Sequence, residues 1–193
     1  MPSFINPFFN AGEKTGKAVY DVHDIANIIL RKLYDYSKID PSFLPTNMKL
    51  LKLLYFVQGF YIKYNDVKLF DGCFQAWVNG PVIPSIFQRF KYYGTSVIRE
   101  DEIGRLIKIG DHCNNLINSV IKEYGKKPPY ELSRLTHEDG TAWKKTRIKN
   151  NLSEYQSSQC VIPYEFISEE FEGKDLEGYL GKFLQKLRDR KIQ

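Results

Sequence analysis

The side chains best suited to catalysis or metal binding in this sequence are its three histidines and three cysteines, namely His23, His112, His137, Cys73, Cys113 and Cys160. A catalytic zinc ion usually needs three convergent protein ligands, and a structural one needs four. The run His137–Glu138–Asp139 is a tempting cluster, but adjacent residues on a regular backbone point in different directions. We therefore predict no metal site and interpret His137 as a capping or packing residue beside Trp143.

Covalent catalysis and nucleotide binding each have one weak candidate. A nucleophile needs an activating base, and Cys113 follows His112, but neighbours along a helix face apart. We interpret Cys113 as a small buried residue. A phosphate-binding P-loop has four residues between its glycines and a Ser or Thr after the Lys. The segment Gly12–Ala18 has three residues between its glycines and Ala18 after Lys17, so no catalytic residue and no cofactor are predicted.

The composition predicts one well-packed domain with a modest positive charge. At 193 residues, with 42% hydrophobic and 15% aromatic side chains, the chain has ample apolar material for a full core. We expect residues 1–20 to form an N-terminal extension and residues 21–193 a single domain. The net charge of +5 is compatible with an acidic partner but too small to indicate nucleic-acid binding by itself.

Other features of the chain favour a cytoplasmic protein. The cysteines are widely spaced without a C-x-x-C pair, which indicates reduced thiols, and no apolar run is long enough to span a membrane. The N-terminus lacks the cationic and apolar regions of a signal peptide. Basic residues gather at 144–149 and 186–191, but such clusters are usually solvated, so we expect neither nucleic acid nor a membrane as partner.

Residues 45–65 are predicted to form the long helix around which any functional site is arranged. Apolar residues recur at spacings of three and four from Leu50 to Tyr64, which predicts a long amphipathic helix. Thr46 is suited to be its N-cap, because its hydroxyl can accept from an otherwise unpaired backbone N–H.

A short hairpin and a second helix are predicted to follow. Apolar residues on both sides of Asp71–Gly72 favour short strands with this pair as the turn. Gly80 permits a backbone conformation that a side chain would forbid, and Pro81 fixes the next φ angle. Pro84 suits the first turn of the next helix, and Gly94 suits its end.

The remaining elements are mostly helical. Helices are predicted after Asp21, from Asp111 to Gly125, at 130–136, around Trp143 and from Leu176 onwards. Residues 96–109 and 150–158 are expected to be irregular, and 160–162 a brief strand. The fold class is therefore mainly α with a small β element (α+β): a compact helical domain with a short hairpin between two helices.

Two features indicate binding rather than catalysis. The predicted helix at residues 45–65 has a second face, apart from its apolar one, that carries Lys49, Lys52, Phe56 and Lys63. This face is either a stripe for docking a partner or merely a solvated surface. Aromatic residues also crowd positions 55–93, and partly exposed Tyr and Trp are common hot spots of protein interfaces. We expect at least two of these aromatic residues to line a partner-binding groove.

Three short motifs resemble those of one family, the SocA-like antitoxins with a Panacea domain. They cover roughly residues 21–150 and occur in the family's order. The first follows K-L-x-K-L-x-Y, the second A-W-x-x-G-P-V, and the third L-S-x-L-[ST]-H followed by a Trp. In this sequence the matching residues are Lys49, Leu50, Lys52, Leu53 and Tyr55; Ala76, Trp77, Gly80, Pro81 and Val82; and Leu132, Ser133, Leu135, Thr136, His137 and Trp143.

The resemblance implies a non-enzymatic antitoxin of a bacterial or phage type II toxin–antitoxin system. Such a protein neutralises a cognate toxin, encoded by the adjacent gene, by direct binding, and some relatives also act as adaptors for a protease. Candidate toxin-binding residues are Lys49, Lys52, Tyr55, Phe56, Trp77, Gly80 and Pro81, with His137 and Trp143 as motif residues of unassigned role. A nucleic-acid-associated regulator and an enzyme with an unrecognised site are the alternative hypotheses. If the cationic face of the helix at residues 45–65 contacts the toxin, charge reversal at Lys49 and Lys52 is expected to weaken toxin binding.

Overall fold

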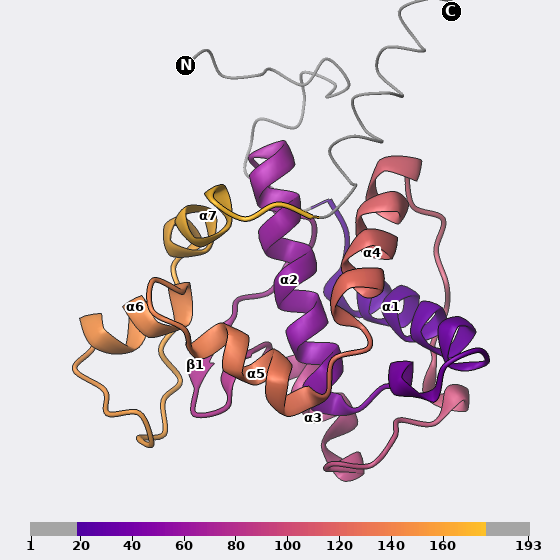
Figure 1. The fold of residues 1–193 in the computed structure, drawn as a ribbon, viewed down its shortest axis with the longest axis horizontal. Coiled ribbons are helices and arrows are strands. Elements are labelled where there is room, and N and C mark those ends of the chain that lie inside the picture. The colour runs from indigo at the N-terminus through magenta and orange to yellow at the C-terminus, as the bar shows by residue number, and fades with distance from the viewer. Residues whose placement is uncertain (1–18, 177–193) are drawn as a thin grey trace, which may run out of the picture.

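The structure is a computed structural model that describes residues 19–176, and it is mainly helical with a small antiparallel hairpin (Figure 1). This confirms the predicted fold class. The α-helices of the described part are α1 Val22–Ser37, α2 Asn47–Asn65, α3 Pro84–Phe90, α4 Asp111–Tyr124, α5 Pro129–His137, α6 Ala142–Lys149 and α7 Tyr164–Glu172. The strands are β1 Gln75–Trp77 and β2 Gly80–Val82, and short 3₁₀ turns cover Pro41–Phe43, Lys91–Tyr93 and Glu100–Glu102.

Helix α2 is the centre of the fold, and the prediction that it is amphipathic with a solvated cationic stripe is wrong. In Figure 1, α2 lies between α1 and α4 on one side and α6 and α7 on the other, and it also contacts α5 and β2. Lys49 is only 3% exposed, Lys52 1% and Phe56 2%. The physical reason is that most of α2 is covered on every side, so Lys49 and Lys52 extend along the core and place their ammonium groups on backbone carbonyls. Lys63, in the last turn, is partly buried and pairs with Asp175.

The hairpin lies slightly later in the chain than the Asp71–Gly72 turn predicted. Strand β1 pairs antiparallel with β2 in a register that joins Trp77 to Gly80, so Val78 and Asn79 form the turn. The earlier segment around Leu69 is held elsewhere, because Gln58 accepts from the Leu69 N–H and Tyr20 forms a parallel bridge with Phe70. The predicted brief strand at 160–162 is present as an isolated bridge to β1.

Helix α7 was not predicted, because its acidic residues resemble a solvated charge cluster. It packs against α2 through Phe171, which is fully buried and forms edge-to-face contacts with Tyr55 and Phe60. The two helices approach closely at Gly59, where an added Cβ would lie 2.2 Å from the Phe171 ring. The glycine therefore makes room for the ring that anchors α7.

Several local predictions are confirmed. The side chains of Asp21 and Thr46 cap α1 and α2, and Pro84 opens α3. Helix α4 ends at Gly125 as expected, although its N-cap is Gly110 rather than Asp111. None of the helices in residues 19–176 combines the length and apolar character needed to cross a bilayer. The P-loop-like segment, the basic residues 186–191 and nearly all of the helix predicted from Leu176 onwards lie outside the described residues.

Candidate partner-binding site

The hairpin is held by side chains that donate to almost every carbonyl around its turn. The donors come from α2 and from the consecutive helices α5 and α6, so parts that are far apart in the sequence meet here. The pairs are Arg147 Nη1 to Ala76 O at 2.7 Å, Trp143 Nε1 to Trp77 O at 2.7 Å, His137 Nε2 to Val78 O at 2.9 Å, Ser133 Oγ to Asn79 O at 2.8 Å and Lys52 Nζ to Pro81 O at 3.0 Å. This arrangement fixes the hairpin backbone while leaving its outer side chains in solvent.

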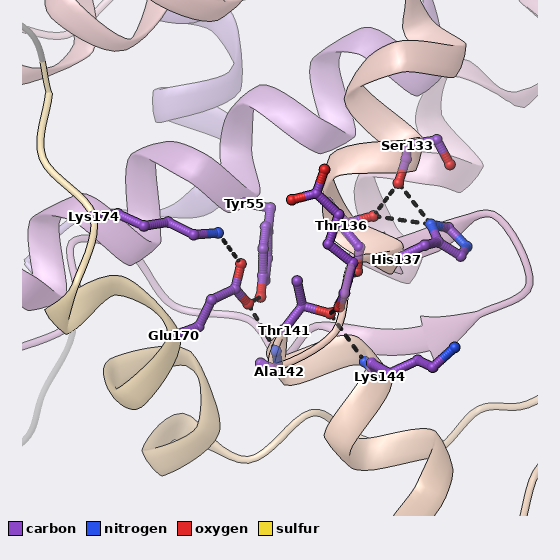
Figure 2. A network of polar contacts seen from close by, with 10 residues as sticks. Tyr55, Ser133, Thr136, His137, Thr141, Ala142, Lys144, Glu170 and Lys174 are labelled. Carbon is purple, nitrogen blue, oxygen red and sulfur yellow. Dashed lines mark hydrogen bonds and ion pairs between the residues drawn. The ribbon is translucent and has the colours of Figure 1, made fainter.

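His137 packs beside Trp143, as predicted, and it also contacts the hairpin backbone. Its ring centroid is 3.8 Å from that of Trp143, and its Nδ1 lies 2.6 Å from the Ser133 carbonyl oxygen. With Nε2 on the Val78 carbonyl, both ring nitrogens are engaged, and Figure 2 shows the ring beside Ser133 and Thr136. Among residues 19–176, no group of three or more His, Cys, Asp or Glu side chains could hold a metal ion.

The two buried lysines of α2 have lowered pKa values because burial disfavours their charged forms. The pKa of Lys52 falls to about 7 and that of Lys49 to about 8. Lys49 Nζ donates to the Ser42 carbonyl at 2.5 Å and to the Gly125 carbonyl at 2.9 Å, which ties α2 to the end of α4. Neither lysine forms an ion pair with a carboxylate among the described residues.

A second polar cluster connects α2, α6 and α7 behind the hairpin (Figure 2). Glu170 accepts from the Tyr55 hydroxyl and, at 2.7 Å, from the Ala142 N–H, and its other oxygen pairs with Lys174 at 2.6 Å. Burial and the neighbouring Glu170 carboxylate raise the pKa of Tyr55 well above its usual value. The cluster therefore fixes the N-terminus of α6, which carries Trp143.

Arg147 joins the hairpin to the loop at residues 150–159. It is 2% exposed, and besides the Ala76 carbonyl its guanidinium donates to the carbonyls of Ser153, Glu154 and Gln156. A planar guanidinium suits this task because its N–H groups point in fixed directions. Arg147 is thus buried, so this member of the basic cluster at 144–149 is not available to contact the phosphates of a nucleic acid.

The loop, the hairpin, α3 and the first half of α2 enclose a groove of about 410 Å³. Trp77 forms one wall and makes an edge-to-face contact with Phe87 at 5.0 Å between ring centroids. The lining residues include Lys52 and Lys91 but no Asp or Glu, and they are Asn47, Met48, Leu51, Lys52, Trp77, Val78, Asn79, Val82, Phe87, Lys91, Gly94, Ser157, Ser158 and Gln159. Two aromatic residues from positions 55–93, Trp77 and Phe87, thus line this groove.

The structure separates the predicted toxin-binding residues into two groups. Trp77 is partly exposed in the groove, whereas Tyr55 and Phe56 are core residues and cannot contact a partner in this conformation. Gly80 and Pro81 are buried in β2, and Lys52, although it is among the groove's lining residues, is only 1% exposed. The Lys49–Lys52 docking stripe is therefore corrected to a structural role, in which the lysine stems pack inside the fold.

Sequence reasoning missed three residues of the site. Arg147 lies four residues after Trp143 on one helix face, a spacing that could have suggested a shared role. Glu170 was missed because it lies in an acidic segment that resembles a solvated charge cluster. The helical spacing of Ile167 and Phe171 could have indicated a helix there. Asn47, the first residue of α2, carried no sequence signal, yet its Oδ1 is buried at the groove without a hydrogen-bond partner.

Comparisons with known proteins point to the same part of the chain. Residues 50–144 match the family model described as antitoxin SocA-like, Panacea domain. Over 133 residues, covering 64% of this chain and 68% of the relative, the sequence is 28% identical to the antitoxin SocA of Caulobacter vibrioides (strain NA1000 / CB15N). No solved structure matches the chain. The matched range contains the hairpin and most of the side chains that hold it.

Proposed function

Because the chain belongs to the SocA-like antitoxin family with a Panacea domain, we propose that it neutralises a cognate toxin by binding it directly, without catalysis. The surface proposed to bind is the groove beside the hairpin. One observation carries this assignment: the motif residues converge on the hairpin carbonyls and so hold Trp77 at the groove wall.

The geometry is suited to recognition because the backbone of the hairpin is fixed before any partner arrives. A rigid aromatic wall loses little conformational entropy on binding, which is how preorganised interfaces gain affinity. Trp77 and Phe87 supply partly buried aromatic surface, and the polar loop residues 157–159 complete the rim. This is the usual composition of an interface centre with a polar edge.

We expect Trp77→Ala to abolish neutralisation of the toxin while leaving the fold intact. The Trp77 carbonyl that accepts from Trp143 belongs to the backbone and survives the change, whereas the groove loses an aromatic wall. Loss of a hot-spot aromatic residue costs about 2 kcal/mol or more, which is roughly thirtyfold in Kd. The measurement is growth rescue on co-expression with the adjacent gene's product, together with Kd by calorimetry.

A matched control is Tyr130→Ala, which removes another large aromatic residue that is 74% exposed on α5 and does not line the groove. It should rescue growth as the unchanged protein does. If Trp77→Ala binds and rescues as well as Tyr130→Ala, the groove is not the contact surface. If the unchanged protein neither binds nor rescues, the antitoxin assignment itself is wrong for this toxin.

Occlusion and delivery to a protease predict different fates for the toxin. Under occlusion, the toxin accumulates in the complex, so its cellular level stays constant or rises when this chain is co-expressed. Under delivery, its level falls and recovers in a protease-deficient strain. We propose occlusion as the primary mechanism, because a preformed groove accounts for it without a further partner.

A further inference from the structure

The groove has an electrostatic and hydrogen-bonding character that specifies what it binds. Of its lining side chains, Lys52 and Lys91 are cationic and none is acidic. The first turn of α2 also contributes Asn47 and Met48, and the N-terminal end of a helix carries partial positive charge. An anionic group therefore complements this groove better than a cationic one.

Lys52 is the more deeply buried of the two lysines that line the groove, and it is cationic below its lowered pKa of about 7. Its side chain is 1% exposed, and its Nζ donates to a single acceptor among the described residues, the Pro81 carbonyl. An ammonium group has three N–H donors, so further acceptors can be accommodated. A buried lysine without a carboxylate partner gains from a ligand that supplies one, since pairing offsets desolvation.

Asn47 favours a ligand that carries a hydrogen-bond donor. Its Nδ2 donates to the Phe87 carbonyl at 3.2 Å, which fixes the amide so that Oδ1 is the free acceptor. That Oδ1 is buried and has no hydrogen-bond partner among residues 19–176, and an unpaired buried acceptor is costly. A backbone N–H of a bound peptide segment can supply the missing donor.

Resting on the antitoxin function above, we propose that the groove binds a short acidic peptide segment of the partner, with its carboxylate at Lys52 and a backbone N–H at Asn47 Oδ1. The apolar neighbours of the acidic residue lie against Trp77 and Phe87. Lys91, exposed at the rim, attracts the same charge. An apolar or basic segment does not satisfy this set of groups.

The test uses two blocked tripeptides, N-acetylated and C-amidated: Leu-Glu-Leu and Leu-Gln-Leu. Binding is followed at pH 6, where Lys52 is protonated, by two-dimensional NMR of the whole protein. The indole N–H of Trp77 reports on the groove, and the backbone N–H of Ser119, on α4 and outside the groove lining, serves as the internal reference. We expect the glutamate peptide to bind roughly fivefold or more tightly than the glutamine peptide. The shifts should appear at Trp77 and not at Ser119.

Lys52→Met, which keeps the length and apolar stem, should reduce that preference to about twofold or less. Lys122→Met, at an exposed position of α4, should leave it unchanged. Equal affinity for the two peptides, or shifts that avoid Trp77, would overturn the proposal even if Lys52→Met does not fold. Neither outcome touches the antitoxin function, which the toxin-binding measurement tests separately.

Discussion

Replacing Gly80 with alanine is expected to destabilise the protein by roughly 2–5 kcal/mol and to displace the hairpin. Gly80 has a φ of 97°, which is strained for any residue with a Cβ. The added Cβ would also lie 2.5 Å from Thr136 Oγ1 and 2.8 Å from Lys52 Nζ. Neither atom can withdraw freely, because Thr136 donates to the Ser133 carbonyl and Lys52 donates to the Pro81 carbonyl.

Gly140→Ala is the matched control, because Gly140 also has a positive φ of 83° but its Cβ would meet nothing within 4 Å. It should cost only the backbone strain, about 1–2 kcal/mol. Urea unfolding of both variants measures the difference. If the two variants lose the same stability, the close packing of α2, α5 and β2 at Gly80 is not as the structure has it.

The second expected result concerns pH: between pH 7 and 9.5 the protein should gain roughly 2–3 kcal/mol of stability through Lys52 alone. Burial lowers the pKa of Lys52 to about 7 from an ordinary value of 10.5. In this window the unfolded chain still binds the lysine proton and the folded chain has released it. The free energy of unfolding therefore rises with pH.

This contribution is isolated by comparing unfolding free energies of Lys52→Met and the unchanged protein across the same window. Lys49, with its pKa lowered to about 8, adds a slope of the same sign to both proteins and cancels in the comparison. The window stops at pH 9.5 because tyrosines with raised pKa values, such as Tyr124, oppose the trend above it. Lys91→Met, at an exposed position, should keep the full slope. Parallel curves for Lys52→Met and the unchanged protein would contradict a desolvated Lys52.

Local signals predicted the helices where periodicity and capping agree. Thr46, Pro84 and Gly125 act at the predicted ends of their helices because capping depends on a few neighbouring residues. Helix α7 was missed because its exposed acids outnumber the apolar residues that face α2, and only tertiary packing decides between them.

The candidate site was harder to predict, because its residues interact over long stretches of sequence. The motifs placed Lys52, Trp77 and His137 together by resemblance, yet sequence spacing assigned Lys52 to a solvated face. Burial of that lysine depends on α5 and β2 packing over α2, at separations of 29 residues to Pro81 and more to α5. The position of a charged residue in an amphipathic pattern does not show whether the folded protein offers it backbone carbonyls as buried hydrogen-bond acceptors.

The same correction changes how the interface should be probed. Charge reversal at Lys49 or Lys52 would bury an uncompensated carboxylate beside carbonyl oxygens, so it would unfold the protein and not report on binding. Substitutions at partly exposed groove positions such as Trp77 leave the core intact and test contact with the partner.

The most direct measurement is hydrogen–deuterium exchange of this chain, free and in complex with the toxin that it is proposed to bind. Toxin contact at the groove predicts slower exchange at residues 75–82, 87–94 and 157–159, with the exposed face of α4 unchanged. Protection confined to α4, or no change at the hairpin in a complex that forms, would contradict the groove as the toxin-binding surface.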